Sequence, residues 1–229
     1  MSKYSNVGID RPECPYCHQI FPKMPQRKTK CPYCKIFFYS RTRPSDQKKV
    51  LVTEEQLKIL EKDWEIYSAT KEFRKYLESN VGFNEKYEKV KENLTKRWGF
   101  TPSEGDTLWG TSIEFLLDAM KQGDLQKMKV LYFDQALYLH QKGENHFRIL
   151  QEVAKCDLKK YQKEGYKKVE ILTAGEQSCP ACQKLSGKIL NIEEALKDLP
   201  IPVKNCSFKL NPEAPVGWCR CQYLPVIPE

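Results

Sequence analysis

Apolar side chains recur every three or four positions through the middle of the chain, which is the spacing of one face of an α-helix. The first such stretch opens with Thr53 and Gln56, a pair that resembles a capping box, and its apolar pattern predicts a helix to about Ser79. Further helices are expected around Asn84 to Trp98, from Pro102 to Gly123, from Asp124 to about Leu139, and from Gly143 to about Tyr161. Because short turns with glycine join them, we expect an antiparallel helical bundle.

The pattern differs on either side of these helices. Residues 41–46 combine proline with polar residues and predict a linker. From Lys168 onward, Val169–Thr173 is strand-like, and the rest is rich in Cys, Pro and Gly apart from a short helix near Ile192–Leu199. The pattern therefore predicts three parts.

The N-terminal part contains an internal repeat of four residues. Cys14-Pro15-Tyr16-Cys17 is echoed by Cys31-Pro32-Tyr33-Cys34. Each Cys-Pro-x-Cys turn presents two sulfurs to one ion, and two such turns complete a tetrahedral site. The spacing predicts a zinc ribbon, and four sulfurs close the coordination sphere, so the metal has a structural role.

A second group of cysteines lies near the C-terminus. It offers five candidate ligands where four are normally used: Cys179, Cys182, Cys206, Cys219 and Cys221. We expect Cys179, Cys182, Cys219 and Cys221 to be the ligands, because Cys219 and Cys221 share one short turn. Cys206 is the alternative ligand. A thioredoxin-type redox pair or free thiols are the competing interpretations.

These observations predict a mainly α fold that binds two zinc ions. The expected parts are a zinc ribbon at residues 1–45, a helical domain at 50–165 and a small α+β zinc-binding module at 166–229. In the cytosol, ten cysteines that mostly occur in close pairs are explained more easily as metal ligands than as disulfides.

The C-terminal cysteines also carry a family resemblance. This part contains Cys179-Pro180-Ala181-Cys182, then Leu185-Ser186-Gly187-Lys188, and finally Cys219-Arg220-Cys221. The order resembles the C-terminal segment of the phage Mu F-like minor head (head morphogenesis) proteins, which typically show Cys-x-x-Cys, a Leu-Asp-Gly-Lys-like turn and a closing Cys-Arg-Cys. The resemblance implies an origin in a phage or mobile element.

The net charge of +8 lies entirely in the N-terminal part, where residues 1–50 hold 11 Lys and Arg against 3 Asp and Glu. A zinc ion with four thiolates carries a formal charge of −2, so the metallated ribbon stays strongly basic. Because its basic residues alternate with aromatic ones, such a surface is suited to binding DNA or RNA. Binding of another protein is the alternative. The candidate contacts are Arg27, Lys28, Lys30, Lys35, Arg41 and Arg43.

The sequence contains no residues that support a membrane, secreted or catalytic function. The longest apolar runs are far shorter than a membrane span, and residues 1–6 lead into charged residues without the apolar stretch of a secretory signal, which predicts a cytoplasmic protein that does not contact membranes. No catalytic residues stand out, and His140 and His146 are expected to be packed or surface residues.

The resulting hypothesis is a non-enzymatic, zinc-binding protein of phage or mobile-element type that binds nucleic acid through its ribbon. A structural protein of phage head morphogenesis, with phage or host proteins as partners, is the first alternative. An enzyme such as a nuclease with an unrecognised active site is the second.

Overall fold

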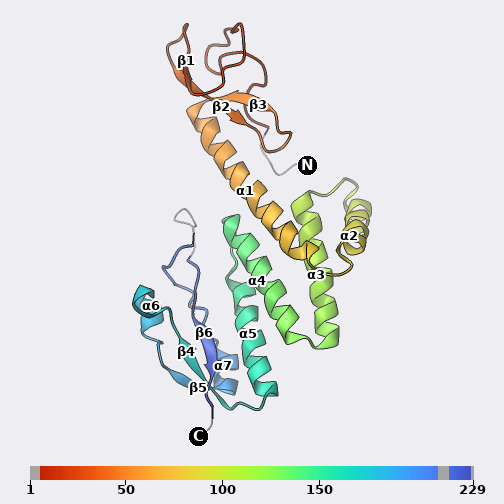
Figure 1. Ribbon diagram of the computed structural model, residues 1–229, viewed down its shortest axis with the longest axis vertical. Coiled ribbons are helices and arrows are strands. Elements are labelled where there is room, and N and C mark those ends of the chain that lie inside the picture. Colours follow the sequence, from red (N-terminus) through yellow and green to blue (C-terminus); the bar gives the residue numbers. More distant parts are fainter. Residues whose placement is uncertain (1–5, 211–216, 228–229) are drawn as a thin grey trace.

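The computed structural model describes residues 6–210 and 217–227. The chain forms three parts arranged along an elongated molecule (Figure 1). A small N-terminal sheet occupies one end, a helical bundle fills the middle, and an α+β module lies beside the bundle toward the other end. The predicted fold class, mainly α with a cysteine-rich module on either side of a central bundle, is therefore confirmed.

The N-terminal sheet contains three antiparallel strands in the order β1 (Thr29–Lys30), β2 (Phe37–Thr42) and β3 (Lys49–Val52). The segment expected to be a linker is instead the turn between β2 and β3. In this turn the buried guanidinium of Arg43 pairs with Asp46 at 2.7 Å. The sheet thus continues past residue 45 and ends just before the first helix.

Five helices follow, close to their predicted positions. They are α1 (Glu54–Glu78), α2 (Phe83–Trp98), α3 (Glu104–Gln122), α4 (Leu125–Gln141) and α5 (Phe147–Lys163). Thr53 and Gln56 form the expected capping box at the start of α1. Gly99 and Gly123 end α2 and α3 in the left-handed conformation, which glycine adopts without steric cost. Among the described residues, none of the helices combines the length and the apolar character that crossing a bilayer requires.

Aromatic rings from three helices form the centre of the bundle. Phe73 of α1 stacks on Tyr138 of α4 with ring centroids 4.4 Å apart, and Trp109 of α3 lies against both rings. The apolar pattern of α3 is wider than the face that it buries. Leu108 and Leu116 are buried, whereas other apolar residues of this helix remain exposed, namely Ile113, Leu117 and Met120.

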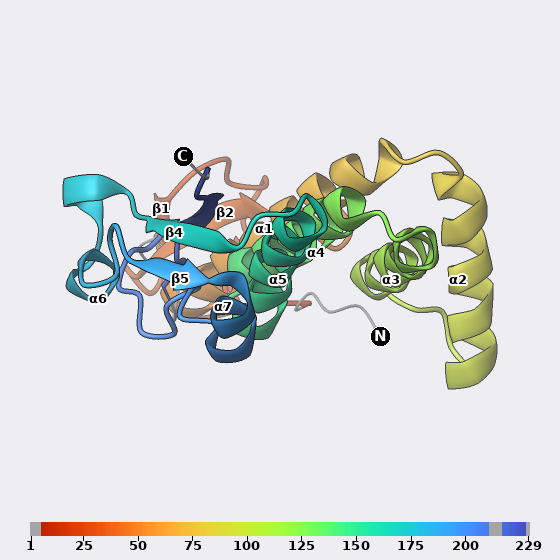
Figure 2. The ribbon, with the colours of Figure 1, turned by 90° about the horizontal axis from the view of Figure 1, so that it is seen from below.

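The C-terminal module is a second three-stranded antiparallel sheet in the order β5-β4-β6, formed by β4 (Lys168–Leu172), β5 (Ile189–Asn191) and β6 (Gln222–Pro225). Its short helices are η1 (Gly175–Gln177), α6 (Pro180–Gln183) and α7 (Ile192–Asp198). Figure 2 shows this module and α2 on opposite sides of the bundle. The Tyr161 hydroxyl of α5 donates to the Tyr223 carbonyl at 3.2 Å and ties β6 to the bundle.

The Phe73 stack gives a test of the bundle core. Replacing Phe73 with Ala removes a ring that is 1% exposed, and we expect a loss of about 3–5 kcal/mol in the free energy of unfolding. Denaturant unfolding followed by helical circular dichroism measures the change. Tyr76→Ala, at a position of α1 that is 44% exposed, is the control and should cost far less. Equal losses in both variants would contradict this account of the core.

Candidate metal centres

Two turns of the same geometry hold the N-terminal cysteines. In the first, Cys14 N–H donates to the Gln19 carbonyl and His18 N–H donates to the Cys14 carbonyl. In the second, Cys31 N–H donates to the Ile36 carbonyl and Lys35 N–H donates to the Cys31 carbonyl. The residues after the second cysteine of each pair, His18 and Lys35, have φ angles of 60° and 65°. The sequence repeat is therefore also a structural repeat, which we call the two knuckles.

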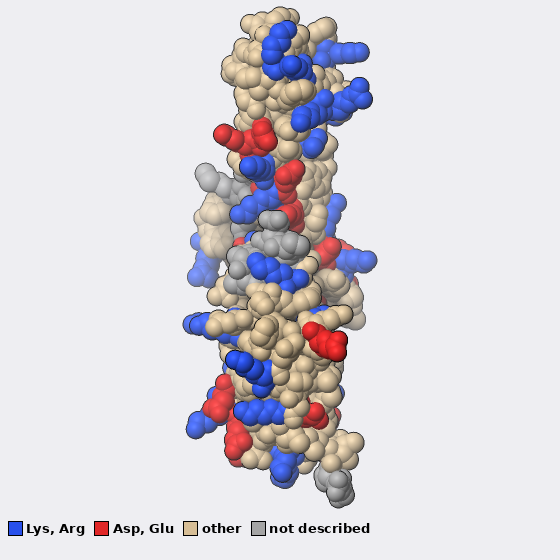
Figure 3. Space-filling view, turned by 90° about the vertical axis from the view of Figure 1, so that its left-hand side faces the viewer, with Lys and Arg blue, Asp and Glu red and all other residues tan. Residues whose placement is uncertain are grey.

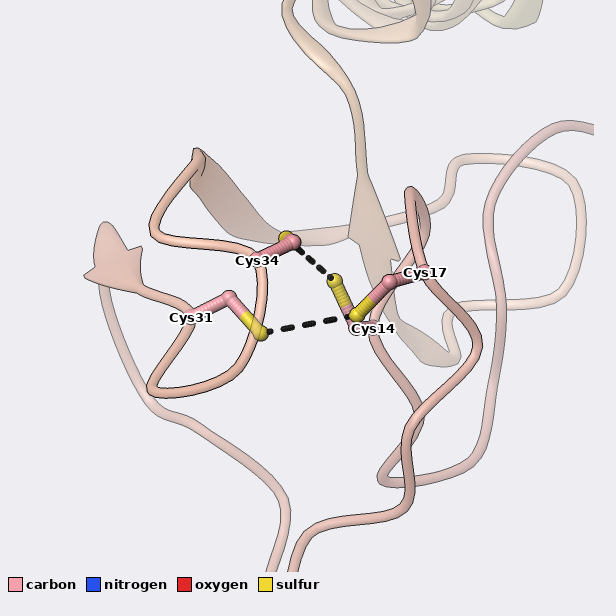
Figure 4. Close-up of side chains that lie close together, drawn as sticks. All are labelled: Cys14, Cys17, Cys31 and Cys34. Carbon is pink, nitrogen blue, oxygen red and sulfur yellow. Dashed lines mark hydrogen bonds between the residues drawn. The ribbon is translucent and has the colours of Figure 1, made fainter.

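The two knuckles direct their four sulfurs toward one point (Figure 4). The Sγ atoms of Cys14 and Cys34 are 3.8 Å apart, and those of Cys17 and Cys31 are 3.7 Å apart. A tetrahedron of sulfurs with Zn–S bonds of about 2.3 Å has edges of about 3.8 Å. The knuckles thus fit a zinc ion without rearrangement, and four thiolates leave no open position for a substrate.

Burial and local hydrogen bonds act on these thiols in opposite directions. Burial raises the pKa of the Cys14 thiol to about 12. At Cys31 burial also acts to raise the pKa, but the N–H groups of Cys34 and Tyr33 donate to the sulfur and the pKa is lowered to about 7. A divalent cation stabilises all four thiolates together, because it offsets negative charges that burial alone disfavours.

The second cluster gathers cysteines from three separate stretches of the C-terminal module. Cys179 precedes α6 and Cys182 lies within it, Cys206 follows α7, and Cys219 and Cys221 precede β6. These thiols fall into two close sets that share Cys182, one with Cys179 and Cys206 and one with Cys219 and Cys221. This cluster is therefore also able to hold a metal ion, and sulfur ligands favour zinc.

Cys206 joins the first of these two sets from a distant part of the sequence. Its Sγ lies 3.8 Å from that of Cys179 and 3.7 Å from that of Cys182, while the Sγ atoms of Cys182 and Cys219 are 3.9 Å apart. All three distances match the edge of a tetrahedral zinc site, which is about 3.8 Å. Cys206 and Cys221 therefore each lie in a close set with Cys182, and the choice of Cys221 as the fourth ligand stays a prediction from the sequence.

Gly217 brings the Cys206 loop against the segment that carries Cys219. A Cβ atom at Gly217 would lie 1.7 Å from the Cys206 carbonyl oxygen, so no other residue fits this close approach of two backbones. Trp218 N–H donates to the Phe208 carbonyl at 2.7 Å and holds the same pair of segments together. Sequence spacing alone did not reveal this contact.

Cys219 and Cys221 differ in their readiness to ionise. The Cys221 thiol donates to the Cys219 sulfur and lowers the pKa of Cys219 to about 6, and the same contact raises the pKa of Cys221. Cys219 is buried and Cys221 is half-buried, and both line a cavity of about 330 Å³ beside the cluster. A bound divalent cation would ionise both thiols, so this difference does not decide which of them is a ligand.

Two histidines pack beside the second cluster, a contact that sequence reasoning missed. His140 and His146 are 3% and 2% exposed, and both rings lie against Trp218 at centroid distances of 5.3 and 5.1 Å. Among the described residues, neither nitrogen of the His140 ring has a hydrogen-bond partner. Burial lowers the pKa of His140 to about 4, so this ring is neutral at pH 7. Helical spacing carried no signal for the contact, which depends on the tertiary fold.

Most of the basic residues singled out from the sequence lie on the ribbon surface. The exposed ones are Arg27, Lys28, Lys30, Lys35 and Arg41. The prediction that Arg43 contacts nucleic acid is wrong. Its side chain is only 7% exposed and already binds Asp46 and the Val7 carbonyl. On the face shown in Figure 3, Lys and Arg gather at the top, where the ribbon lies, while both signs of charge mix along the rest.

No protein-family model, no curated protein and no solved structure matches this chain. The resemblance of its C-terminal motif to phage Mu F-like proteins therefore stays a prediction from the sequence.

The two clusters predict the metal content of the protein. We expect about two equivalents of zinc per chain, since each cluster supplies enough thiolates for one ion. Cys14→Ser should remove one equivalent and leave the other, with most of the helical signal retained, because the bundle has its own core. Elemental analysis together with circular dichroism measures both effects. A wild-type protein without bound zinc would contradict the assignment of both clusters.

The fourth ligand of the second site can be tested separately. From the Sγ distances and the burial of Cys206, we expect Cys206→Ser to release the C-terminal zinc and Cys221→Ser, which changes a half-buried thiol, to retain it. Metal analysis of the two variants, each in a Cys14→Ser background, reports on this site alone. Retention in Cys206→Ser with loss in Cys221→Ser would instead support the ligand set expected from the sequence.

Proposed function

We propose that this chain is a non-enzymatic zinc-binding protein that binds nucleic acid through its ribbon. Each cysteine cluster holds one structural zinc ion. The ribbon, defined here as residues 6–52, provides the binding surface, and the bundle and the C-terminal module support it. The origin in a phage or mobile element belongs to the same proposal and depends on the C-terminal motif.

The observation that carries the proposal is the position of the charge. Residues 1–50 contain the whole net charge of +8, and the remaining residues contain 27 basic and 27 acidic side chains. With zinc bound to four thiolates, the N-terminal part remains near +6 by formal count. Clustered positive charge on one small module attracts polyanions, and duplex DNA, with one negative charge per roughly 1.7 Å of helix axis, is such a polyanion.

The ribbon also keeps its cations available to a ligand. Arg27 and Lys28 are exposed in the segment that leads into β1, and Lys30 is exposed on β1 itself. No acidic residue lies between Glu13 and Asp46 in the sequence. Residues 14–45 therefore contribute no carboxylate that could neutralise Arg27, Lys28 and Lys30. Cations of this kind contribute phosphate contacts that do not depend on base sequence.

Salt dependence tests this function. A ribbon that neutralises a few phosphates should give a slope of log affinity against log salt on the order of −3 to −5 for duplex DNA. Changing Arg27, Lys28 and Lys30 together to Ala should flatten the slope by up to about three units while the zinc stays bound. Fluorescence anisotropy with labelled DNA and RNA over a range of salt concentrations measures the slope.

A matched control removes the same charges elsewhere. Lys89, Lys96 and Arg97 are exposed on α2, and their replacement with Ala also neutralises two lysines and one arginine. This variant should bind as the wild type does. If the intact protein shows no salt-dependent binding to DNA or RNA at low ionic strength, the proposed function is wrong and the basic surface serves protein docking.

A further inference from the structure

Strand β2 presents two different faces because side chains alternate along a strand. Phe38 and Ser40 are buried, and the Phe38 ring stacks on Phe21 in the ribbon core with centroids 5.5 Å apart. The residues between and beside them, Phe37, Tyr39 and Arg41, therefore lie on the opposite face. Phe37 is 49% exposed, so the ribbon displays a large aromatic ring that its own core does not use.

Basic side chains gather around the aromatic rings of this face. In the sheet Lys30 pairs with Phe37, and its Nζ lies 5.7 Å from the centre of that ring. Lys28, just before β1, places its Nζ 5.1 Å from the Phe37 ring and 5.0 Å from the Tyr39 ring. The Arg41 guanidinium lies 5.6 Å from the Tyr39 ring. We call these five residues the basic aromatic face.

The spacing of the two rings suits consecutive, unstacked bases. Residues two apart on a strand lie about 6.6 Å from each other, roughly twice the separation of stacked bases. A duplex keeps its bases stacked on one another and offers only their edges in the grooves. A single strand can turn a base so that its flat surface lies on an aromatic ring, while nearby cations contact the phosphates.

From this arrangement we infer that the basic aromatic face binds single-stranded nucleic acid. One base stacks on Phe37, and Tyr39, which is half-buried, offers a second and more restricted ring. Lys28, Lys30 and Arg41 contact the backbone on either side. This inference rests on the proposed function and deepens it, since it names the class of nucleic acid and the residues that distinguish it.

The same contacts have a simpler interpretation, in which the cations only cover exposed rings and stabilise the sheet. The two interpretations differ in what the ring contributes to binding. A ring that serves as a stacking platform contributes to affinity for single strands through its aromatic surface, and this contribution is insensitive to salt. A ring that is only covered by lysines contributes nothing to binding once the fold is intact.

Replacement of Phe37 with Leu separates these possibilities, because it keeps an apolar side chain but removes the aromatic surface. The full-length zinc-loaded protein is titrated with a labelled 12-nucleotide thymidine or uridine single strand and with a duplex of equal length. We expect the wild type to prefer the single strands, and Phe37→Leu to weaken their binding by about ten-fold without changing the salt slope. Phe100→Leu is the matched control, since Phe100 is similarly exposed at 53% but lies outside the ribbon.

The outcomes distinguish this inference from the proposed function. Salt-dependent binding that is equal for single strand and duplex and unchanged in Phe37→Leu overturns the inference and leaves the proposed function intact. Absence of binding to every nucleic acid overturns both. Zinc content measured for each variant shows whether the ribbon is still folded.

Discussion

Convergence of four cysteine sulfurs on one point, where a divalent ion would bind, is the constraint on which the ribbon depends. Its strand β1 has only two residues, and the buried cluster around its cysteines contains little beyond Phe21, Phe38 and Leu51, since Val50 and Val52 pack instead on Leu60 of α1. A core of this size contributes too little hydrophobic free energy to hold two knuckles together without a cross-link. In the zinc-bound protein that we propose, the metal supplies that cross-link at the position where the repeated hydrogen bonds already direct the sulfurs. The basic aromatic face is built on the same strands and so depends on the same ion.

In the C-terminal module, the second cluster likewise brings cysteine sulfurs together, but without a repeated turn. Its cysteines come from three stretches that the sequence separates widely, and the strands of the module are short. Contacts such as that between Gly217 and the Cys206 carbonyl show how closely these stretches approach. Trp218 extends the cluster into the bundle through His140 and His146. A metal ion bound in this module would therefore be coupled to the packing of α4 and α5.

The sequence predicted those features that local chemistry determines. The capping pair Thr53 and Gln56, the glycines after α2 and α3, and the repeated Cys-Pro-Tyr-Cys turns each act within a few residues, and the structure has them as expected. The features that were missed depend on the tertiary fold. Arg43 belongs to a segment whose composition predicts a linker, but its ion pair with Asp46 forms in the turn between β2 and β3.

The position of Cys206 could not be predicted from the sequence for the same reason. Spacing along the chain favoured Cys221 over Cys206, because Cys221 shares a turn with Cys219. Only the folded backbone reveals that a distant loop brings Cys206 to Cys179 and Cys182. Binding to nucleic acid is harder still to predict. The charge of the sequence indicates only a polyanionic partner, and the proposal of a single strand depends on how rings and cations are arranged on one face of the ribbon.

The unbroken length of α1 has a mechanical consequence. This helix has 25 residues, which at 1.5 Å per residue corresponds to about 37 Å. Its first turns are joined to the ribbon, because the Trp64 indole N–H donates to the Thr42 carbonyl and the Glu54 N–H donates to the Tyr16 hydroxyl. Its last turns contribute Phe73 and Leu77 to the bundle core. The helix therefore acts as a stiff lever arm, so a torque applied to the ribbon by a bound polymer would be transmitted to the bundle instead of being absorbed at a hinge.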